Sequence, residues 1–337
     1  HYPLRRQRQM CIRDRYTEEG YSLVPIRWED RYKIMQWRND QMYHLRQQTI
    51  LTKLDQDKYF NDVISFLFDQ ESPKQLLFSF LKDGECIGYG GLVHLDWDKK
   101  TAEISFLINT SLEKTYFKKL WSLFLIMIEK IAFKDLGFLK IYTFSYDLRP
   151  QLYELLAAQE YLEVKRLVKE KLVDNQWVDG LFHFKETSEL FHRKVKMSDS
   201  NILFEWLNEK ISRSNSLNKN TISWDEHSKW FNQKINDPNN EMYIFYKFNN
   251  VGLLRLENEN DKTKISFTVD KFYRGKGIGS KIIETALILH PNTNFIADVL
   301  NENISSHKIF LKNKFNLEKN SNLLKNGITQ YTKKSSL

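Results

Sequence analysis

The feature that most constrains the fold is a set of three sequence echoes, which occur in the same order in the two halves of the chain. The echoes are WRND at Trp37 and WLNE at Trp206, TILTKLDQDKYF at Thr49 and TISWDEHSKWF at Thr221, and KTAEISF ending at Phe106 and KTKISF ending at Phe267. Their offset of about 160 to 170 residues is far longer than a solenoid period. We therefore predict two domains of one fold, residues 20–187 and 188–337.

Each half also has the same predicted order of elements. A strand and two helices come first, then a run of antiparallel strands, a helix, a strand, a helix and closing strands. In the first half, alternating apolar residues predict strands at 75–81 and 85–95 around a Lys82-Asp83-Gly84 turn. A strongly apolar run predicts a helix over 120–133.

The net charge of the chain is +8, from 51 Lys and Arg against 43 Asp and Glu. Residues 1–15 supply half of this excess, because they hold five arginines and a single acid, Asp14. This segment begins with His rather than Met and has no apolar period. We predict that residues 1–19 are a non-native or disordered arm and exclude them from the fold. A nucleic-acid-binding arm is the alternative.

The remaining excess of positive charge is mild, and it fits an anionic cofactor better than a nucleic-acid surface. Cys11 and Cys86 are the only cysteines, so the chain offers no disulfide framework and no zinc site, and we predict no metal. The most apolar run, 120–133, is too short to span a bilayer and contains Glu129 and Lys130. We expect a cytoplasmic protein with no membrane span and no nucleic-acid partner.

A strand, a glycine-rich turn and a helix follow one another over residues 264–290. Ile265, Phe267 and Val269 alternate with polar residues, which predicts a half-buried strand. The turn is Arg274-Gly275-Lys276-Gly277-Ile278-Gly279-Ser280, and apolar residues at helical spacing follow it. Glycines let backbone N–H groups approach a ligand, and a helix N-terminus presents free donors. This arrangement predicts a phosphate or pyrophosphate site.

Three known phosphate-binding patterns can be compared with this turn. The P-loop pattern fails because Ser280 precedes Lys281 and the four-residue spacer is missing. The dinucleotide pattern GxGxxG fails because the third glycine comes one residue early. The acyl-CoA pattern [QR]-x-x-G-x-[GA] matches at Arg274, Gly277 and Gly279. A glycine-rich loop with no ligand remains the alternative.

On this motif and on the order of elements, the chain resembles the GNAT superfamily of acetyltransferases over nearly all of residues 20–335. The resemblance implies an α/β (α+β) fold of two tandem GNAT domains, each with a mixed, mostly antiparallel central sheet flanked by helices. The first half is most similar to the branch that contains the ribosomal-protein N-terminal acetyltransferases. The second half resembles acetyltransferases of nucleotide-linked amino sugars.

The resemblance implies acetyl transfer from acetyl-CoA, as co-substrate, to a primary amine. The turn would hold the pyrophosphate, and the strand before it would align the pantetheine and offer an N–H to the oxyanion. Asn303 matches the family's cofactor-contacting Asn, although a helix cap is an equal interpretation. The predicted cofactor-binding residues are Phe267, Thr268, Val269, Arg274, Gly275, Lys276, Gly277, Ile278, Gly279, Ser280, Asn303 and Phe310.

Candidates for the acceptor side lie on the segments that the family uses for that purpose. Glu257, at the end of a strand, is the first candidate for the general base, and a solvated strand-end Glu is the alternative. His227 is a candidate acceptor contact or base, or a surface-helix His. Trp224 is a candidate stacking residue or part of the core, and Arg255 is a further predicted acceptor contact.

Two departures from the family pattern affect the mechanism. Phe310 stands where many relatives have the Tyr that protonates the CoA thiolate, so no general acid is assigned, with His307 or water as the substitutes. The first half has no glycine between Ile108 and Leu120, and Arg149-Pro150 replaces the Asn. We interpret it as a degenerate GNAT domain that serves structure, acceptor binding or packing.

The sequence therefore predicts one competent acetyl-CoA site, in residues 188–337. The predicted partner is a small-molecule amine acceptor, with an amino sugar or a nucleotide-linked amino sugar as the first guess. Two alternatives remain open: acetylation of a protein N-terminus or lysine, and a non-catalytic module that binds acyl-CoA or a glycan intermediate.

Overall fold

The computed structural model describes residues 15–67, 69–318 and 327–335. The chain divides into two units, residues 1–187 and 188–337, and each is described by itself. The arm predicted over residues 1–19 lies outside the described residues as far as residue 14. Its last part needs correction, because Tyr16–Glu18 forms strand β1, which pairs with β2 and buries Tyr16.

Unit 1 is built on one mixed sheet, with the strand order β1-β2-β3-β4-β5-β6-β8-β7 among the described residues. Its strands are β1 (Tyr16–Glu18), β2 (Tyr21–Pro25), β3 (Gln75–Lys82), β4 (Glu85–Asp96), β5 (Thr101–Ile108), β6 (Lys140–Tyr146), β7 (Leu162–Val173) and β8 (Gln176–Glu186). All neighbouring pairs are antiparallel except β5–β6. The exception arises because the chain crosses over through a helix between these two strands.

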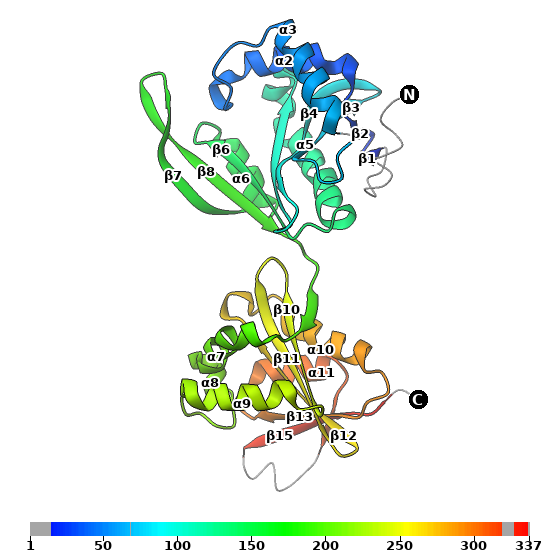
Figure 1. Cartoon of the computed structure of the whole chain (residues 1–337), viewed down its shortest axis with the longest axis vertical. Helices are drawn as coiled ribbons and strands as arrows, with labels where there is room; N and C mark the ends of the chain where they lie inside the picture. Colours follow the sequence, from blue (N-terminus) through cyan, green and yellow to red (C-terminus); the bar gives the residue numbers. More distant parts are fainter. Residues whose placement is uncertain (1–14, 68, 319–326, 336–337) are drawn as a thin grey trace. The chain divides into compact units, whose positions relative to one another are not determined.

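Helices cover both faces of this sheet (Figure 1). They are α2 (Arg31–Asp40), α3 (Lys53–Tyr59), α4 (Ser65–Leu67), α5 (Thr110–Glu129) and α6 (Pro150–Ala158), with π-helical segments at Phe60–Ile64 and Lys130–Asp135. One core lies between the sheet and α5, where the rings of Phe106 and Phe124 stack at 3.8 Å. The second core lies under α2 and includes Ile34 and Trp37.

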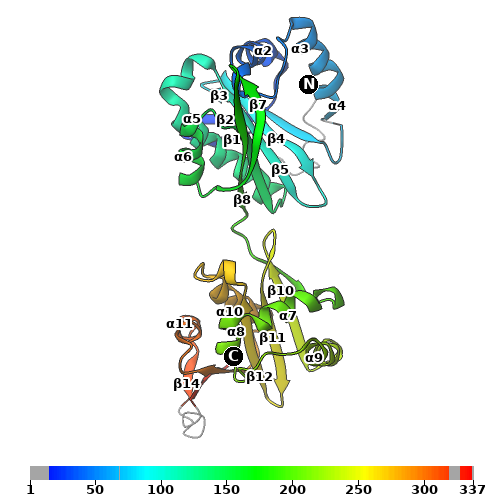
Figure 2. The ribbon, with the colours of Figure 1, turned by 90° about the vertical axis from the view of Figure 1, so that its left-hand side faces the viewer.

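Unit 2 repeats this plan with the strand order β14-β15-β13-β12-β11-β10-β9 among its described residues (Figure 2). Its strands are β9 (Phe191–Lys194), β10 (Asn240–Tyr246), β11 (Asn250–Glu259), β12 (Lys262–Val269), β13 (Phe295–Leu300), β14 (Asn316–Glu318) and β15 (Ile328–Lys333). The pair β12–β13 is parallel, and the others are antiparallel. The predicted mixed, mostly antiparallel sheets of an α/β fold are thus confirmed.

The helices of unit 2 also lie on both faces of its sheet. They are α7 (Ser200–Asn208), α8 (Lys210–Ser214), α9 (Trp224–Asn236), α10 (Ile278–Leu289) and α11 (Ile304–Lys312). Ile282 and Ala286 of α10 pack with Phe310 of α11 in one core. Leu203 of α7 and Phe231 of α9 pack in the other core. Each face is therefore closed by an amphipathic helix pair.

The helix predicted over 120–133 is longer than the apolar run indicated, because α5 begins at Thr110. Asn109 caps it by accepting a hydrogen bond from the Ser111 N–H at 3.0 Å. The apolar run marks only its buried part, whereas the first turns carry charged residues that face solvent.

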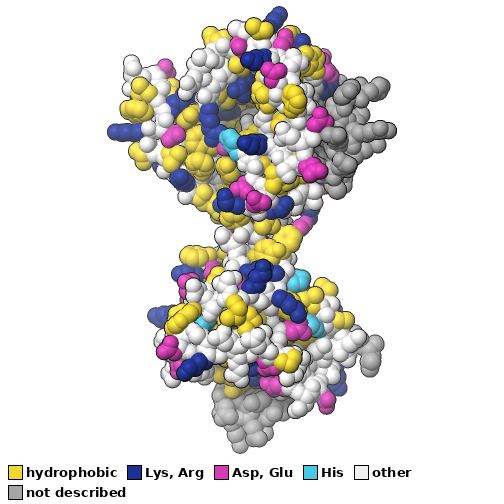
Figure 3. Space-filling view, in the orientation of Figure 1, with side chains coloured by type: hydrophobic (Ala, Val, Ile, Leu, Met, Phe, Trp, Pro, Cys, Tyr) yellow, Lys and Arg dark blue, Asp and Glu magenta, His cyan; other side chains and the backbone are white. Residues whose placement is uncertain are grey.

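In the face drawn in Figure 3, basic and acidic side chains are interspersed. No helix among the described residues is long and apolar enough to cross a membrane.

Candidate functional site

Two neighbouring strands of unit 2 separate at the centre of its sheet. The parallel pair β12–β13 is formed only by Thr263 with Phe295 and Lys264 with Ile296. Strand β12 then continues to Val269, paired with β11 on its other edge throughout. Among the described residues, no strand pairs with the last part of β12 on the side of β13. The backbone groups there suit an extended, amide-containing ligand.

The glycine-rich turn begins where β12 ends. Gly275 and Gly277 have φ of +75° and +76°, a left-handed backbone conformation that residues other than glycine rarely adopt. A Cβ added at either position would meet no atom within 4 Å. Gly277 is the N-cap of α10 and supplies no side-chain bond to the first helical N–H groups. Those donors and the helix dipole face open space, which fits a pyrophosphate.

Gly279 has a different role from the other two glycines of the turn. A Cβ at Gly279 would lie 2.7 Å from Cδ1 of Ile309 and 3.0 Å from a ring carbon of Phe267. This glycine therefore lets α10 approach α11 and β12. Together the turn, β12 and α11 line a cavity of about 460 Å³.

Arg274 fastens the turn to the rest of unit 2. Its guanidinium donates hydrogen bonds to the Glu209 carboxylate at 2.6 Å, to the Val269 carbonyl at 3.1 Å and to the Ser212 hydroxyl at 3.1 Å. Burial disfavours the charged form of Glu209, but the hydrogen bonds from Arg274 and from two backbone N–H groups outweigh it and lower the pKa of Glu209 to about 2. The side chain predicted to meet phosphate is thus held by a carboxylate.

A second cavity, of about 640 Å³, lies next to the first. Phe267, Thr268, Asn303 and Ser306 line both cavities, so the two spaces meet at the end of β12. The segment 215–222 between α8 and α9, which we call the rim, also lines the second cavity, and its residues Asn215 and Ser216 line both. We call the first space the donor cavity and the second the acceptor cavity.

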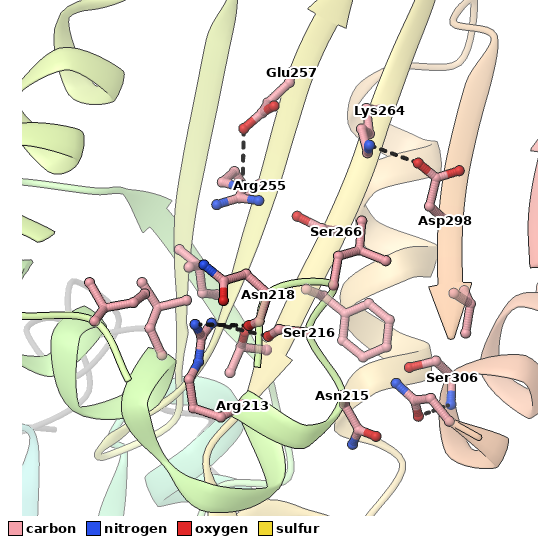
Figure 4. A pocket seen from close by; sticks show the side chains of 18 of the residues that line it. Arg213, Asn215, Ser216, Asn218, Arg255, Glu257, Lys264, Ser266, Asp298 and Ser306 are labelled. Carbon is pink, nitrogen blue, oxygen red and sulfur yellow. Dashed lines mark hydrogen bonds and ion pairs between the residues drawn. The ribbon is translucent and has the colours of Figure 1, made fainter. Parts of the chain in front are cut away.

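Charged side chains of three adjacent strands meet in the acceptor cavity (Figure 4). Glu257 of β11 lies 3.4 Å from Nε of Arg255 and 3.6 Å from Nζ of Lys234. Lys264 of β12 contacts Asp298 of β13 at 2.7 Å. Each carboxylate therefore already has a basic partner.

The structure gathers most of the predicted site residues around these two cavities. The predicted residues that line the donor cavity are Phe267, Thr268, Val269, Arg274, Gly275, Gly277, Ile278, Gly279, Ser280 and Asn303. Those that line the acceptor cavity include Glu257, Arg255, His227 and Phe310. Lys276, Trp224 and His307 line neither.

Three of the predicted side chains form contacts that hold the fold together. Asn303 caps α11, because its side-chain oxygen accepts a hydrogen bond from the Ser306 N–H at 3.1 Å. Both ring nitrogens of His307 are engaged, one with the Tyr331 hydroxyl at 2.8 Å and one with the Leu300 carbonyl at 3.1 Å. Phe310 is buried and stacks on Tyr331.

His227 is buried at the edge of the acceptor cavity. Its Nε2 lies 2.9 Å from the Ser200 carbonyl, so this nitrogen carries a proton and donates it. Its Nδ1 is buried and has no hydrogen-bond partner among the described residues. Burial lowers the pKa of His227, and the Ser200 bond opposes this. The imidazole is therefore neutral at pH 7, packed between Trp230 and Phe231.

The sequence analysis missed several polar residues of the acceptor cavity. Asp298 and Lys264 were not predicted, nor were Ser266 and Arg213. For Asp298 a signal existed, since it is the single charged residue of the apolar strand Phe295–Leu300. Arg213 gave no comparable signal, because its role is to hold the rim: its guanidinium donates to the Asn218 and Asn220 carbonyls.

In unit 1, polar side chains form contacts at the corresponding place, the end of β5. The Gln41 side-chain amide donates to the Ile108 carbonyl at 2.8 Å and to the Thr110 hydroxyl at 3.1 Å. Arg149, the buried N-cap residue of α6, contacts Glu113 in the first turn of α5 at 2.6 Å. In unit 1, side-chain contacts thus link α2, α5 and α6 near the end of β5.

Comparisons with known proteins identify a related family for each unit. Residues 23–145 match the family model described as acetyltransferase (GNAT) domain, and residues 203–315 match the model described as acetyltransferase (GNAT) family. No curated protein sequence matches the chain.

Solved structures similar to this chain include a spermidine N-acetyltransferase from Vibrio cholerae in complex with CoA and spermine. It is 17% identical over 51% of this chain and 98% of that chain, with a TM-score of 0.44. A domain from Methanocaldococcus jannaschii DSM 2661 is 22% identical over 44% of this chain and 99% of that chain, with a TM-score of 0.39.

Proposed function

This chain carries two GNAT acetyltransferase domains in tandem, and from this premise we propose that unit 2 transfers an acetyl group from acetyl-CoA to the primary amine of a small acceptor. The chain is an acyltransferase, and acetyl-CoA is its co-substrate, as in the GNAT family. We assign the cofactor to unit 2 and an amino sugar, free or nucleotide-linked, as the first candidate acceptor.

The observation that carries this proposal is the meeting of the two cavities at Phe267 and Thr268. Transfer between two substrates requires that their reacting atoms lie within contact of each other. Gly275 and Gly277 leave open space at the head of α10 for a pyrophosphate. The unpaired edge of β12 then leads from that point towards the acceptor cavity.

In the reaction, the amine nitrogen bonds to the thioester carbon, the carbon–sulfur bond breaks, and the amine gives up a proton. The chain must hold the amine, accept that proton and stabilise the carbonyl oxygen as it gains charge. We assign the last task to a backbone N–H on the open edge of β12. With Phe310 buried and His307 engaged on both nitrogens, we assign protonation of the thiolate to water.

We propose Glu257 as the group that accepts the proton, directly or through a water. It lines the acceptor cavity, and it lies beside two basic side chains, Lys234 and Arg255. Glu257→Gln should lower kcat by roughly 100-fold or more, the upper part of the range for general-base catalysis, with the acetyl-CoA dissociation constant unchanged. Wild-type rates in that variant would remove Glu257 from the mechanism.

Asp298→Asn tests the other carboxylate of the cavity. Its partners are Lys264 and Gln330, at 2.7 and 2.8 Å. A larger loss of kcat in Asp298→Asn than in Glu257→Gln would assign the base to Asp298 instead.

We propose that unit 1 is an accessory domain and binds no acetyl-CoA, because it has no glycine-rich turn after β5 and because Gln41 and Arg149 form side-chain contacts near that strand end.

We also place the protein in the cytoplasm, a reducing compartment. Burial, followed by the charge of Asp30, raises the pKa of the Cys86 thiol to about 12, so this cysteine is unreactive.

A further inference from the structure

The acceptor cavity has a polar floor, formed by one face of the sheet. The antiparallel register sets Arg255 of β11 opposite Ser266 of β12, and Glu257 opposite Lys264. Residues two apart on a strand share a face, so these four side chains point the same way. Figure 4 shows them directed into one space, with Asp298 of β13 beside them.

The carboxylates of this floor are already neutralised. Glu257 has two basic partners, Lys234 and Arg255, and Asp298 is paired with Lys264. The charged side chains that line the cavity balance, because Glu226 and Arg213 also line it and Lys234 approaches Glu257 from outside the lining. With both floor carboxylates paired, the floor offers no unpartnered carboxylate to an additional cation.

Arg255 is the basic side chain of the floor whose N–H donors are not used in hydrogen bonds among the described residues. Its Nε is buried and forms no hydrogen bond, although it lies 3.4 Å from Glu257. Its terminal nitrogens have no hydrogen-bond partner among the described residues, and in Figure 4 they lie on the side away from Glu257. The guanidinium is held near the ring of Trp230, with its carbon 5.4 Å from the ring centre.

The physical setting of Arg255 favours binding of an oxyanion. Burial lowers the pKa of Arg255, and the neighbouring charge of Glu257 opposes this. A partly desolvated cation gains most from a charged hydrogen-bond acceptor, and the planar guanidinium fits carboxylate or phosphate with two parallel bonds. The hydroxyl of Ser266, the residue paired with Arg255, also has no partner within the described ranges and can donate to the same group.

We propose that the acceptor carries an anionic group, a carboxylate or a phosphate, which Arg255 binds together with the Ser266 hydroxyl while the amine of the same molecule points towards the end of β12. This inference rests on the proposed acetyl transfer at the site and specifies its substrate class. Ser266 and Thr268 are two residues apart on one strand, about 7 Å. The anion and the amine of the acceptor should therefore be separated by only a few bonds.

The test is a set of matched acceptors offered to the full-length protein with acetyl-CoA. Ethanolamine is compared with phosphoethanolamine and β-alanine, and glucosamine with glucosamine 6-phosphate, with thiol release as the readout. We expect kcat/KM to be roughly 10- to 100-fold higher for an anionic member than for its neutral counterpart, the usual effect of a charged hydrogen bond. The phosphate and carboxylate members distinguish the two sources of charge.

Arg255→Gln should abolish that preference, mainly through KM, because kcat/KM for the anionic acceptors should fall by a much larger factor than kcat/KM for the neutral ones. Arg255→Lys keeps the charge without the paired geometry and should fall between the two. Lys229→Gln is the control, because it removes one positive charge from an exposed position of α9. Unchanged acetyl-CoA affinity shows that each variant is folded.

Equal use of neutral and anionic acceptors by the wild type, or an equal loss of both in Arg255→Gln, would overturn the inference. A calorimetric titration of phosphoethanolamine into the CoA-loaded protein distinguishes failure of the anion-site inference from failure of the proposed function. If binding requires Arg255 but no amine is acetylated, the anion site stands and the proposed transfer fails. If amines are acetylated without any charge preference, the anion site fails alone.

Discussion

Asn208 holds Ile222 through both sides of its side-chain amide. The amide nitrogen donates to the Ile222 carbonyl and the amide oxygen accepts from the Ile222 N–H, each at 2.9 Å. In unit 1, Asn39 forms the same pair of bonds with Leu51, again at 2.9 Å. The echoes WRND and WLNE thus preserve a contact in which an asparagine at a helix end ties down the loop that follows.

Asn208→Ala should make the rim of the acceptor cavity more mobile, because it removes both hydrogen bonds to the backbone of Ile222. The loss of two hydrogen bonds to backbone should cost roughly 1–3 kcal/mol of unit 2 stability. The KM for the amine should rise by a larger factor than the acetyl-CoA dissociation constant, because most of the segment 215–222 lines the acceptor cavity, whereas only Asn215 and Ser216 of it line the donor cavity. Steady-state kinetics and calorimetry measure the two quantities.

Asn39→Ala is the matched control for that change. It removes the same two bonds in unit 1 and should lower stability by a similar amount, with KM unchanged. A rise in KM of equal size in both variants would show that Asn208 does not act through the rim.

Glu209→Gln should loosen the glycine-rich turn, because the Glu209 carboxylate anchors Arg274. We expect weaker acetyl-CoA binding and a loss of roughly 1.5–3 kcal/mol in the free energy of unfolding at pH 7, the usual range for a charged hydrogen bond. Glu205→Gln, at an exposed position of α7, should change neither quantity.

The effect of Glu209 should also depend on pH. Its pKa is about 2 in the folded protein, below its ordinary value of 4.5. The stabilisation is therefore complete above about pH 4.5 and is lost as the pH falls towards 2. The difference in unfolding free energy between wild type and Glu209→Gln should shrink over that range. A difference that stays constant down to pH 3 would contradict this account of the ion pair.

Gly277→Glu should abolish acetyl-CoA binding, because it places a side chain and a negative charge where the pyrophosphate is proposed to lie. Calorimetric titration should show one binding event per chain in the wild type and none in the variant. Gly84→Glu is the control: Gly84 has φ +85°, with open space around it, in the β3–β4 turn of unit 1. Both variants carry a similar left-handed strain of about 1–2 kcal/mol, but only Gly277→Glu should lose binding. Two binding events in the wild type would mean that unit 1 is also competent.

Unit 1 should lose stability in mild acid because of His44. Burial, followed by the positive charge of Arg149, lowers the pKa of His44 from 6.5 to about 3. Above about pH 6.5 the imidazole is neutral in both the folded and the unfolded chain. Below that pH the unfolded chain binds a proton that the folded chain does not, so stability is lost progressively as the pH falls towards 3.

His44→Gln should therefore flatten the pH dependence of unit 1 stability by up to about 1.4 kcal/mol per pH unit below pH 6.5. Hydrogen exchange read separately in the two units measures this, with unit 2 as the internal reference. Identical slopes for wild type and variant would show that His44 is not held neutral by its surroundings.

Local patterns allowed much of the fold to be predicted. The hairpin around Lys82-Asp83-Gly84 and the strand before the glycine-rich turn follow from period-2 alternation and turn chemistry. The start of α5 was placed ten residues late, because its first turns are polar and the apolar run reports only burial. The apolar run thus marks the part of α5 that is buried against the sheet, and it does not mark where the helix begins.

The two units of similar plan, and the glycine-rich turn at a helix start in one of them, can be read from neighbouring residues, because local patterns encode them. The partners of the charged side chains are set by contacts between distant parts of the chain. Arg274 meets Glu209, 65 residues away, and Gln41 reaches the end of β5, 67 residues away. Asp298 joins Lys264 because a parallel crossover brings their strands together. Charged side chains pair with the oppositely charged groups that lie near them in the folded chain. No local sequence pattern encodes which groups these are.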